Sequence, residues 1–384
     1  MKEKNLLVAG LSLNKLADLL ISAKTTLTAI LVSVGAPIWM VGWLVPIRES
    51  GALLPQVFIS IYLRKHTQRH VVWRVGMMVQ AFSVLVMLLS VVYFSGFTAG
   101  ALLLFALVLL SLGRSACSLT VKDMEADVAK KGERGNLIGI ASTVSGVVTL
   151  AIAIPLVIFD EALSSNVLLF ILGGSLLSFV LTLICVWPVK THVDTGRDEG
   201  QALNVNFDST VYKFIFVRGL FVHSALVAPY FMIERSEDAK ELLPIYIGAE
   251  ALAALLSSII WGKVADKSAR LTLQLSGVLA LSACGALLFL ESTSIITSAI
   301  LFFLLSIAHT GVRTGRKTYS LDVKDGHERT ELVGFSNTAI GIVLLSFGAL
   351  YAALTPVLPF SVVYIMTGML LIAIVMTFIL PSEK

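Results

Sequence analysis

The sequence predicts an all-α membrane protein of twelve transmembrane helices, arranged as two pseudo-symmetric halves of six helices each. Composition is the first observation: of 384 residues, 57% are hydrophobic and 14% are charged, and the mean hydropathy is +0.89. Soluble domains carry about 25% charged residues, so this composition indicates an integral membrane protein. The second observation is a series of apolar runs, each near the ~20 residues that a membrane-spanning helix needs.

An internal repeat is the third observation. Residues in the first half of the chain recur in the second half at offsets of 201 or 195 positions. The matched residues are Glu49 with Glu250, Leu54 with Leu255, Arg69 with Arg270, and Gly146 with Gly341. Transporter folds are often built from such repeats. We therefore expect an N-terminal six-helix half at 1–187, a linker at 188–208 and a C-terminal six-helix half at 209–384.

The twelve spans follow from the apolar runs and from the polar residues that separate them. Hydropathy alone would join Thr25 to Ile47 into one span, but the repeat pairs the second span with the eighth and so favours a division. We place the spans at 12–35, 39–63, 71–94, 97–118, 135–158, 164–187, 209–232, 243–262, 270–290, 293–314, 330–354 and 358–380.

The basic residues orient these spans. The chain has 29 Lys and Arg residues, and all except five lie in loops or at helix ends on one side of the predicted bundle; the five are Lys24, Arg48, Arg218, Arg235 and Lys240. Because basic residues concentrate in cytoplasmic loops, we expect that side, which carries both termini, to be cytoplasmic.

The stretch 262–270 carries a recognisable loop pattern. Its sequence, Gly-Lys-Val-Ala-Asp-Lys-Ser-Ala-Arg, resembles the glycine–aspartate–basic–glycine–arginine signature of the major facilitator superfamily, with Ala269 where that family usually has glycine. The resemblance implies a transporter fold in the inner membrane of a bacterium. It also implies a cytoplasmic gate; its residues would be Gly262, Asp266, Lys267 and Arg270. The alternative is a topological anchor, in which Asp266 caps the ninth helix through free backbone N–H groups.

Four ionisable residues stand out inside the predicted spans. Lys24 and Arg218 lie on the first helix of each half, and Glu49 and Glu250 lie on the second. Ionisable residues within a bilayer usually mark a pathway. We expect the pairs Lys24–Glu49 and Arg218–Glu250. These are either fixed buried ion pairs or pairs that open during transport, when the carboxylate takes up a proton.

Further charged residues extend this set of candidates. Arg48 precedes Glu49, and with Lys24 and Arg218 it would make the cavity lining net positive, which predicts an organic anion or an amphipathic anionic compound as cargo. His223 could titrate near neutral pH or be a structural core residue. Asp18 is expected to cap or pair near the cytoplasmic end. Arg114, His309 and Arg313 are additional cavity candidates, of which the two arginines could serve only as anchors.

The predicted function is secondary active transport by alternating access. Proton coupling is expected, because the chain contains no glycine-rich nucleotide-binding loop. A multidrug efflux pump is the alternative, although the fifth span has Pro155 as its only proline. An enzyme acting on lipid-linked substrates is another alternative, but the predicted loops contain no catalytic cluster. We therefore expect a monomeric membrane protein that transports a small solute together with protons. We expect no enzymatic activity and no metal, cofactor or nucleic-acid partner.

Overall fold

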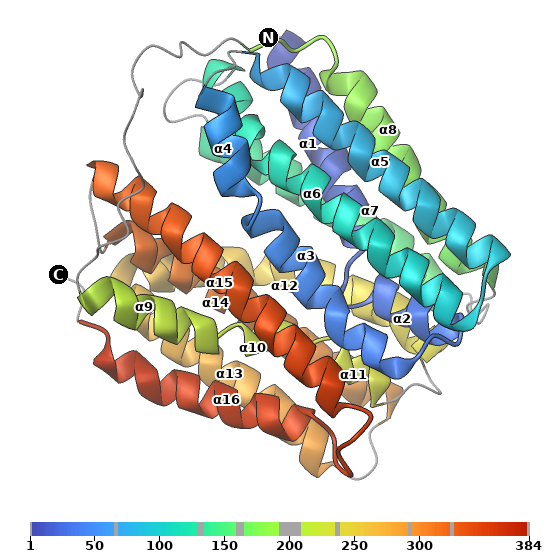
Figure 1. The fold of residues 1–384 in the computed structure, drawn as a ribbon, viewed down its shortest axis with the longest axis vertical. Helices are drawn as coiled ribbons and strands as arrows, with labels where there is room; N and C mark the ends of the chain where they lie inside the picture. The colour runs from blue at the N-terminus through green and yellow to red at the C-terminus, as the bar shows by residue number, and fades with distance from the viewer. Residues whose placement is uncertain are drawn as a thin grey trace.

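The computed structural model describes residues 2–64, 68–128, 134–158, 165–191, 209–234, 239–290, 294–322 and 326–381. Every regular element in these ranges is a helix (Figure 1). The α-helices are α1 (Lys2–Leu20), α2 (Thr26–Ser33), α3 (Val41–Leu53), α4 (Gln56–Arg64), α5 (Arg69–Tyr93), α6 (Gly96–Val128), α7 (Arg134–Ile158), α8 (Ser165–Val186), α9 (Ser209–Leu220), α10 (His223–Leu226), α11 (Tyr230–Ile233), α12 (Ala239–Lys267), α13 (Ala269–Phe289), α14 (Ile295–Asp322), α15 (Gly326–Leu354) and α16 (Val363–Met376), with short 3-10 turns at Ile38–Met40 and Thr377–Ile379. Most of the predicted linker, 192–208, lies outside the described residues.

Eight stretches within the described ranges are long and apolar enough to cross a membrane, which makes the chain a multi-pass membrane protein. They are Arg69–Tyr93, Gly96–Val121, Asn166–Val186, Ser209–Ile233, Leu242–Lys267, Ala269–Phe289, Ile295–Tyr319 and Phe335–Leu354. Shorter apolar helices cover Thr143–Ile154 and Val363–Ile379. The first two predicted spans correspond to interrupted helices, α1 with α2 and α3 with α4.

The first helix begins earlier than predicted and is broken near its middle. It starts at Lys2 and not near Ser12, and it ends at Leu20. Ser22 satisfies backbone groups of the break: its carbonyl accepts from Leu27 N at 3.0 Å, and its hydroxyl accepts from Lys24 N at 3.3 Å. Lys24 is therefore held in an irregular segment and not on a continuous helix.

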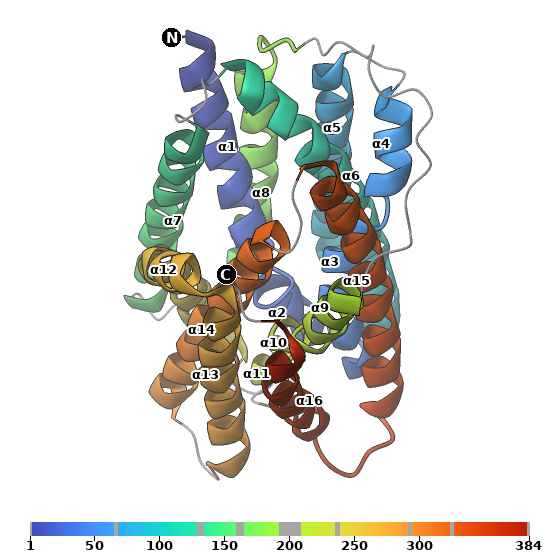
Figure 2. The same ribbon diagram turned by 90° about the vertical axis from the view of Figure 1, so that its left-hand side faces the viewer.

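For description, the helices are divided by sequence into a first group, α1 to α8, and a second group, α9 to α16. In the first group α1 contacts α7 and α8, and α6 contacts α3 and α5. In the second group α14 contacts α12 and α13, and α16 contacts α9 and α13. The two groups meet where α3 packs against α15 and where α7 packs against α12 (Figures 1 and 2).

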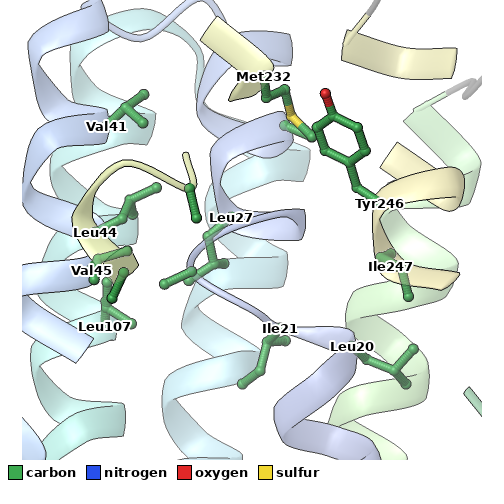
Figure 3. Close-up of a cluster of buried hydrophobic side chains, with 14 of the residues drawn as sticks. Leu20, Ile21, Leu27, Val41, Leu44, Val45, Leu107, Met232, Tyr246 and Ile247 are labelled. Atoms are coloured by element: carbon green, nitrogen blue, oxygen red, sulfur yellow. The ribbon is translucent and has the colours of Figure 1, made fainter. Parts of the chain in front are cut away.

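A buried apolar cluster surrounds the break in the first helix. Figure 3 shows Leu20 and Ile21 from the start of the break and Leu27 from α2, beside Tyr246 and Ile247 of α12. Side chains of α3, α6 and α11 complete the same cluster. Close-packed side chains resist displacement. This cluster therefore holds the break between α1 and α2, and with it Lys24, in a defined position.

Candidate functional site

A small cavity, called the central cavity below, holds most of the predicted charges. Its volume is about 160 Å³, and its lining comes from α1, the break after α1, α3, α6, α12 and α14. Three carboxylates and four basic side chains line it: Asp18, Glu49, Glu250, Lys24, Arg48, Arg114 and Arg313. The lining is therefore net positive, and it includes residues from both groups of helices.

Lys24 forms its ion pair with Glu250, across the two groups of helices. Lys24 Nζ lies 3.8 Å from Glu250 Oε1, and Ser22 Oγ donates a hydrogen bond of 2.9 Å to Glu250 Oε2. The side chains of Lys24 and Glu250 are 16% and 19% exposed. The predicted direct ion pair between Lys24 and Glu49 is wrong, because the break in the first helix turns the Lys24 ammonium towards α12; Glu49 attracts Lys24 only from a greater distance.

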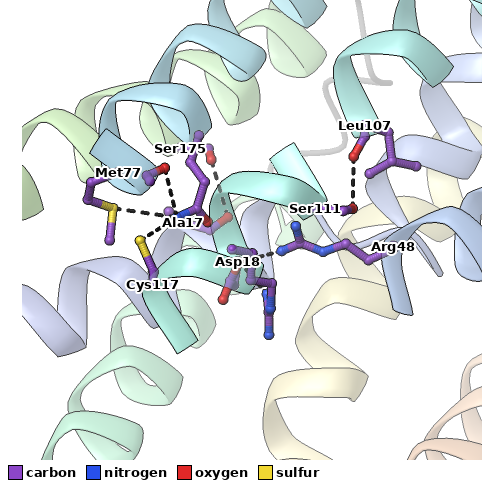
Figure 4. Close-up of polar contacts among 11 residues, drawn as sticks. Ala17, Asp18, Arg48, Met77, Leu107, Ser111, Cys117 and Ser175 are labelled. Atoms are coloured by element: carbon purple, nitrogen blue, oxygen red, sulfur yellow. Dashed lines mark hydrogen bonds and ion pairs between the residues drawn. The ribbon is translucent and has the colours of Figure 1, made fainter. Parts of the chain in front are cut away.

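Asp18 is held between two arginines. Arg48 of α3 binds the Asp18 carboxylate (Figure 4), and Arg114 of α6 lies 2.6 Å from the same oxygen. The Arg48 side chain is only 8% exposed, and among the described residues its NH1 has no hydrogen-bond partner. Of the two expected roles, capping and pairing, Asp18 has the pairing role, with Arg48 and Arg114 as its partners. Since α1 begins at Lys2, Asp18 is sixteen residues into the helix, or about 24 Å along its axis.

Glu49 lines the same cavity from α3. Lys24 and the two α14 arginines, Arg313 and Arg316, are its main electrostatic partners. Arg48, its neighbour in sequence, turns to Asp18 instead. The cavity therefore contains three acidic centres, each facing at least one basic group from another helix.

Arg218 lies outside this cavity, and the predicted Arg218–Glu250 pair is wrong. Its side chain is buried between α9 and α15, where it donates to Ser336 Oγ and, at 2.8 Å, to Asn337 Oδ1. The reason is the packing of α9 against α15, which supplies polar acceptors but directs Arg218 away from α12.

His223 also lies away from the cavity lining. Its ring is fully buried, with Nδ1 2.7 Å from Leu220 O, and it packs edge-on against Phe347 and Tyr351. His309, a second candidate, has Nδ1 3.3 Å from Ser224 Oγ. Both histidines are thus part of the packing between the second group's helices.

The predicted gate residues lie where α12 gives way to α13. Helix α12 continues through Lys267, so Gly262 and Asp266 are helical, and Asp266 and Lys267 are exposed. Ser268 caps α13 by accepting from Leu271 N at 3.1 Å, so the expectation that Asp266 is the cap is wrong. Asp266 precedes the cap by two residues.

Arg270 joins α13 to the end of the chain. It donates to Leu380 O at 3.0 Å, and its guanidinium lies 5.6 Å from the Phe378 ring centre. This contact connects the start of α13 to the segment that follows α16.

Arg114 and Arg313, the two cavity candidates that could have served only as anchors, both line the cavity. Ser22 also lines it, although no sequence pattern marks this residue. The sequence signal for a cavity residue is its depth along its helix. That depth can be counted for α1 only when the start of the helix, at Lys2, is known. Within the described ranges, no group of three or more His, Cys, Asp or Glu side chains is arranged to hold a metal ion.

Comparison with known proteins identifies similar structures only. No protein-family model matches the chain, and no curated protein sequence matches it. A D-xylose–proton symporter aligns with a TM-score of 0.74 at 10% identity, covering 99% of this chain and 98% of the other. A bacterial homologue of the iron transporter ferroportin, in an inward-facing state, aligns with a TM-score of 0.69 at 16% identity, covering 98% of both chains. A bacterial metal transporter aligns with a TM-score of 0.65 at 16% identity, covering 99% and 98%.

Proposed function

On the premise that this chain has the major facilitator fold, we propose that it is a secondary transporter that moves a small organic anion by alternating access. The observation that carries this proposal is the charged cavity, whose lining comes from both groups of helices. Two bodies that rock about such a cavity expose it to one side of the membrane at a time. The three similar structures described above are transporters, which favours transport over an enzymatic function.

The proposed cargo follows from the balance of charge. Asp18 satisfies only part of the hydrogen-bonding capacity of Arg48 and Arg114, and Arg48 NH1 is buried without a partner among the described residues. A guanidinium binds carboxylates and phosphates through paired N–H donors. An anionic group can therefore bind these arginines beside Asp18 or in its place.

The proposed coupling element is the Lys24–Glu250 pair. Separation of the two groups of helices would pull these side chains apart, because Lys24 and Glu250 belong to different groups. A carboxylate that loses its cation in a partly buried site favours protonation. Glu250 would then carry one proton per cycle, in an inner-membrane protein with both termini in the cytoplasm.

Binding can be tested with the purified protein. We would measure the thermal unfolding midpoint against a panel of carboxylates, phosphates, sugars, cations and drugs. Organic anions should raise the midpoint of the wild type, and Arg48→Gln and Lys24→Gln should remove that effect. Lys263→Gln is the matched control, since Lys263 is an exposed basic residue outside the cavity. Stabilisation by neutral or cationic compounds alone, or by anions equally in Arg48→Gln, would contradict the proposal.

Coupling can be tested in proteoliposomes with a labelled anion identified in this way. A pH gradient should drive accumulation by the wild type. Glu250→Gln should abolish that accumulation but keep exchange of labelled for unlabelled anion, which needs no net proton movement. Gradient-driven accumulation that persists in Glu250→Gln would assign coupling to another group.

A further inference from the structure

We infer that the transported anion carries an acyl or alkyl chain, and that this chain occupies a groove between α1 and α7 while the charged group binds in the central cavity. This inference rests on the proposed function and names its substrate class. The groove has a volume of about 630 Å³, within the ~300–1,000 Å³ typical of small-molecule sites. The central cavity, at about 160 Å³, has room for a charged group and not for a chain.

The groove is apolar over most of its length. Helix α1 supplies Val8, Leu13 and Leu16, and helix α7 supplies Ile140, Val144 and Val148, among other residues. Figure 2 shows these two helices near the N-terminal end of the molecule, and they are in contact along part of their length. Such a lining suits a hydrocarbon chain and offers little to a compact polar solute.

One face of α1 links the groove to the charged cavity. Ser12 and Leu16 line the groove, and Leu19 lines the cavity. Residues spaced at i, i+4 and i+7 lie in one stripe along a helix. Asp18 lies about 100° further round α1 than Leu19 and also lines the cavity. A molecule whose chain lies along this stripe beside Leu16 reaches the cavity at Leu19, where its anionic group can meet Arg48 and Arg114.

The groove also opens where lipid would meet the protein. Ile140 and Val144 are 45% and 44% exposed. Val144 is ten residues from the start of α7, about 15 Å along the helix, and the hydrocarbon core of a bilayer is about 30 Å thick. The groove therefore runs from the starts of both helices to about the middle of the hydrocarbon core, so a chain can enter it from the lipid that surrounds Ile140 and Val144.

The test compares a long-chain anion with a short one. Dodecyl phosphate and butyl phosphate carry the same charged group, and their affinities can be measured by calorimetry for protein in phosphatidylcholine nanodiscs. Val144→Phe and Ala9→Phe each place a large side chain in the groove. Val147→Phe is the matched control, because Val147 is 54% exposed on the same helix and does not line the groove.

Both groove variants should bind dodecyl phosphate at least tenfold more weakly than Val147→Phe does, since burying each methylene is worth about a fourfold change in affinity. Their affinity for butyl phosphate should equal that of the wild type, which also shows that the variants are folded. Equal dodecyl phosphate binding by all proteins would mean that the groove holds bilayer lipid only, and would overturn the inference.

The proposed function can fail separately. If short anions bind in an Arg48-dependent manner but dodecyl phosphate does not bind, the groove inference falls and the anion transporter stands. If no anion binds the wild type, both fall.

Discussion

Leu54, the residue that caps the C-terminal end of α3, lies directly against Gly341 of α15. A Cβ atom at residue 341 would stand 2.8 Å from Leu54 Cγ. The same contact occurs a second time between α12 and α7, where a Cβ at residue 146 would stand 2.9 Å from Leu255 Cγ. The internal repeat matches these residues, leucine with leucine and glycine with glycine. The α3–α15 and α7–α12 crossings, which join the two groups of helices, therefore each pack a leucine against a glycine.

Gly341→Ala and Gly146→Ala should therefore destabilise the protein. Each methyl group would press into a leucine at a helix crossing, and overpacking of this kind typically costs about 1–3 kcal/mol. Equilibrium unfolding in mixed micelles measures the change. Gly285→Ala is the control, because a Cβ at that position meets nothing within 4 Å; unchanged stability in both crossing variants would show that the helices separate easily.

Gly348→Ala should be more damaging than Gly341→Ala. A Cβ at residue 348 would lie 2.3 Å from Pro46 Cγ and 2.6 Å from Pro46 Cβ. A proline ring cannot rotate away as a leucine side chain can, so the backbones of α3 and α15 must move apart. A lower unfolding midpoint for Gly348→Ala than for Gly341→Ala would support this, and the reverse order would contradict it.

The Lys24–Glu250 pair predicts coupling between two substitutions. Lys24→Gln and Glu250→Gln each leave one partly buried charge without its partner, whereas the double variant removes both charges. The loss of stability in the double variant should be smaller than the sum of the single losses, by about 0.5–3 kcal/mol. Additive losses, measured by the same unfolding assay, would show that the two side chains do not interact.

Asp18→Asn should separate structure from binding in the arginine cluster. Without this carboxylate, Arg48 and Arg114 repel each other, and removing one partner from a buried ion pair costs about 3–5 kcal/mol. The freed guanidiniums should also bind anions more readily. The unfolding midpoint should fall in buffer, and added organic phosphate should raise it more than in the wild type. A smaller response to phosphate than in the wild type would argue against an anion site at these arginines.

The start of α13 offers a direct test of its cap. Ser268→Ala removes the hydroxyl that accepts from Leu271 N, and loss of an N-cap typically costs about 0.5–2 kcal/mol. Asp266→Ala should leave stability unchanged, because Asp266 is exposed in the last turn of α12. Equal losses in the two variants would restore Asp266 as part of the cap. Thermal unfolding of the purified variants provides the comparison.

The sequence by itself determined the class of protein, most of the helices and the internal repeat. Apolar length reports membrane insertion without any knowledge of packing, so helices such as α5 and α13 begin within a few residues of their predicted starts. The matched Gly–Leu contacts support the repeat, since Leu54, Leu255, Gly146 and Gly341 recur both in sequence and in position. Lys24, Arg48, Glu49 and Glu250 were also identified as members of one charged set.

Only the tertiary structure decided which charges pair. Helical periodicity gives the face of a residue along an unbroken helix, but the break after Leu20 changes the direction of Lys24 and brings it to Glu250. The depth of Asp18 within α1 depends on the ten residues before Ser12, which also belong to the helix. These residues begin with a polar stretch, so hydropathy does not show where the helix starts. Arg218 and His223 were directed into packing contacts by α15, a neighbour more than a hundred residues away. Pairing of this kind depends on how separate helices approach one another, and no local pattern in the chain records that.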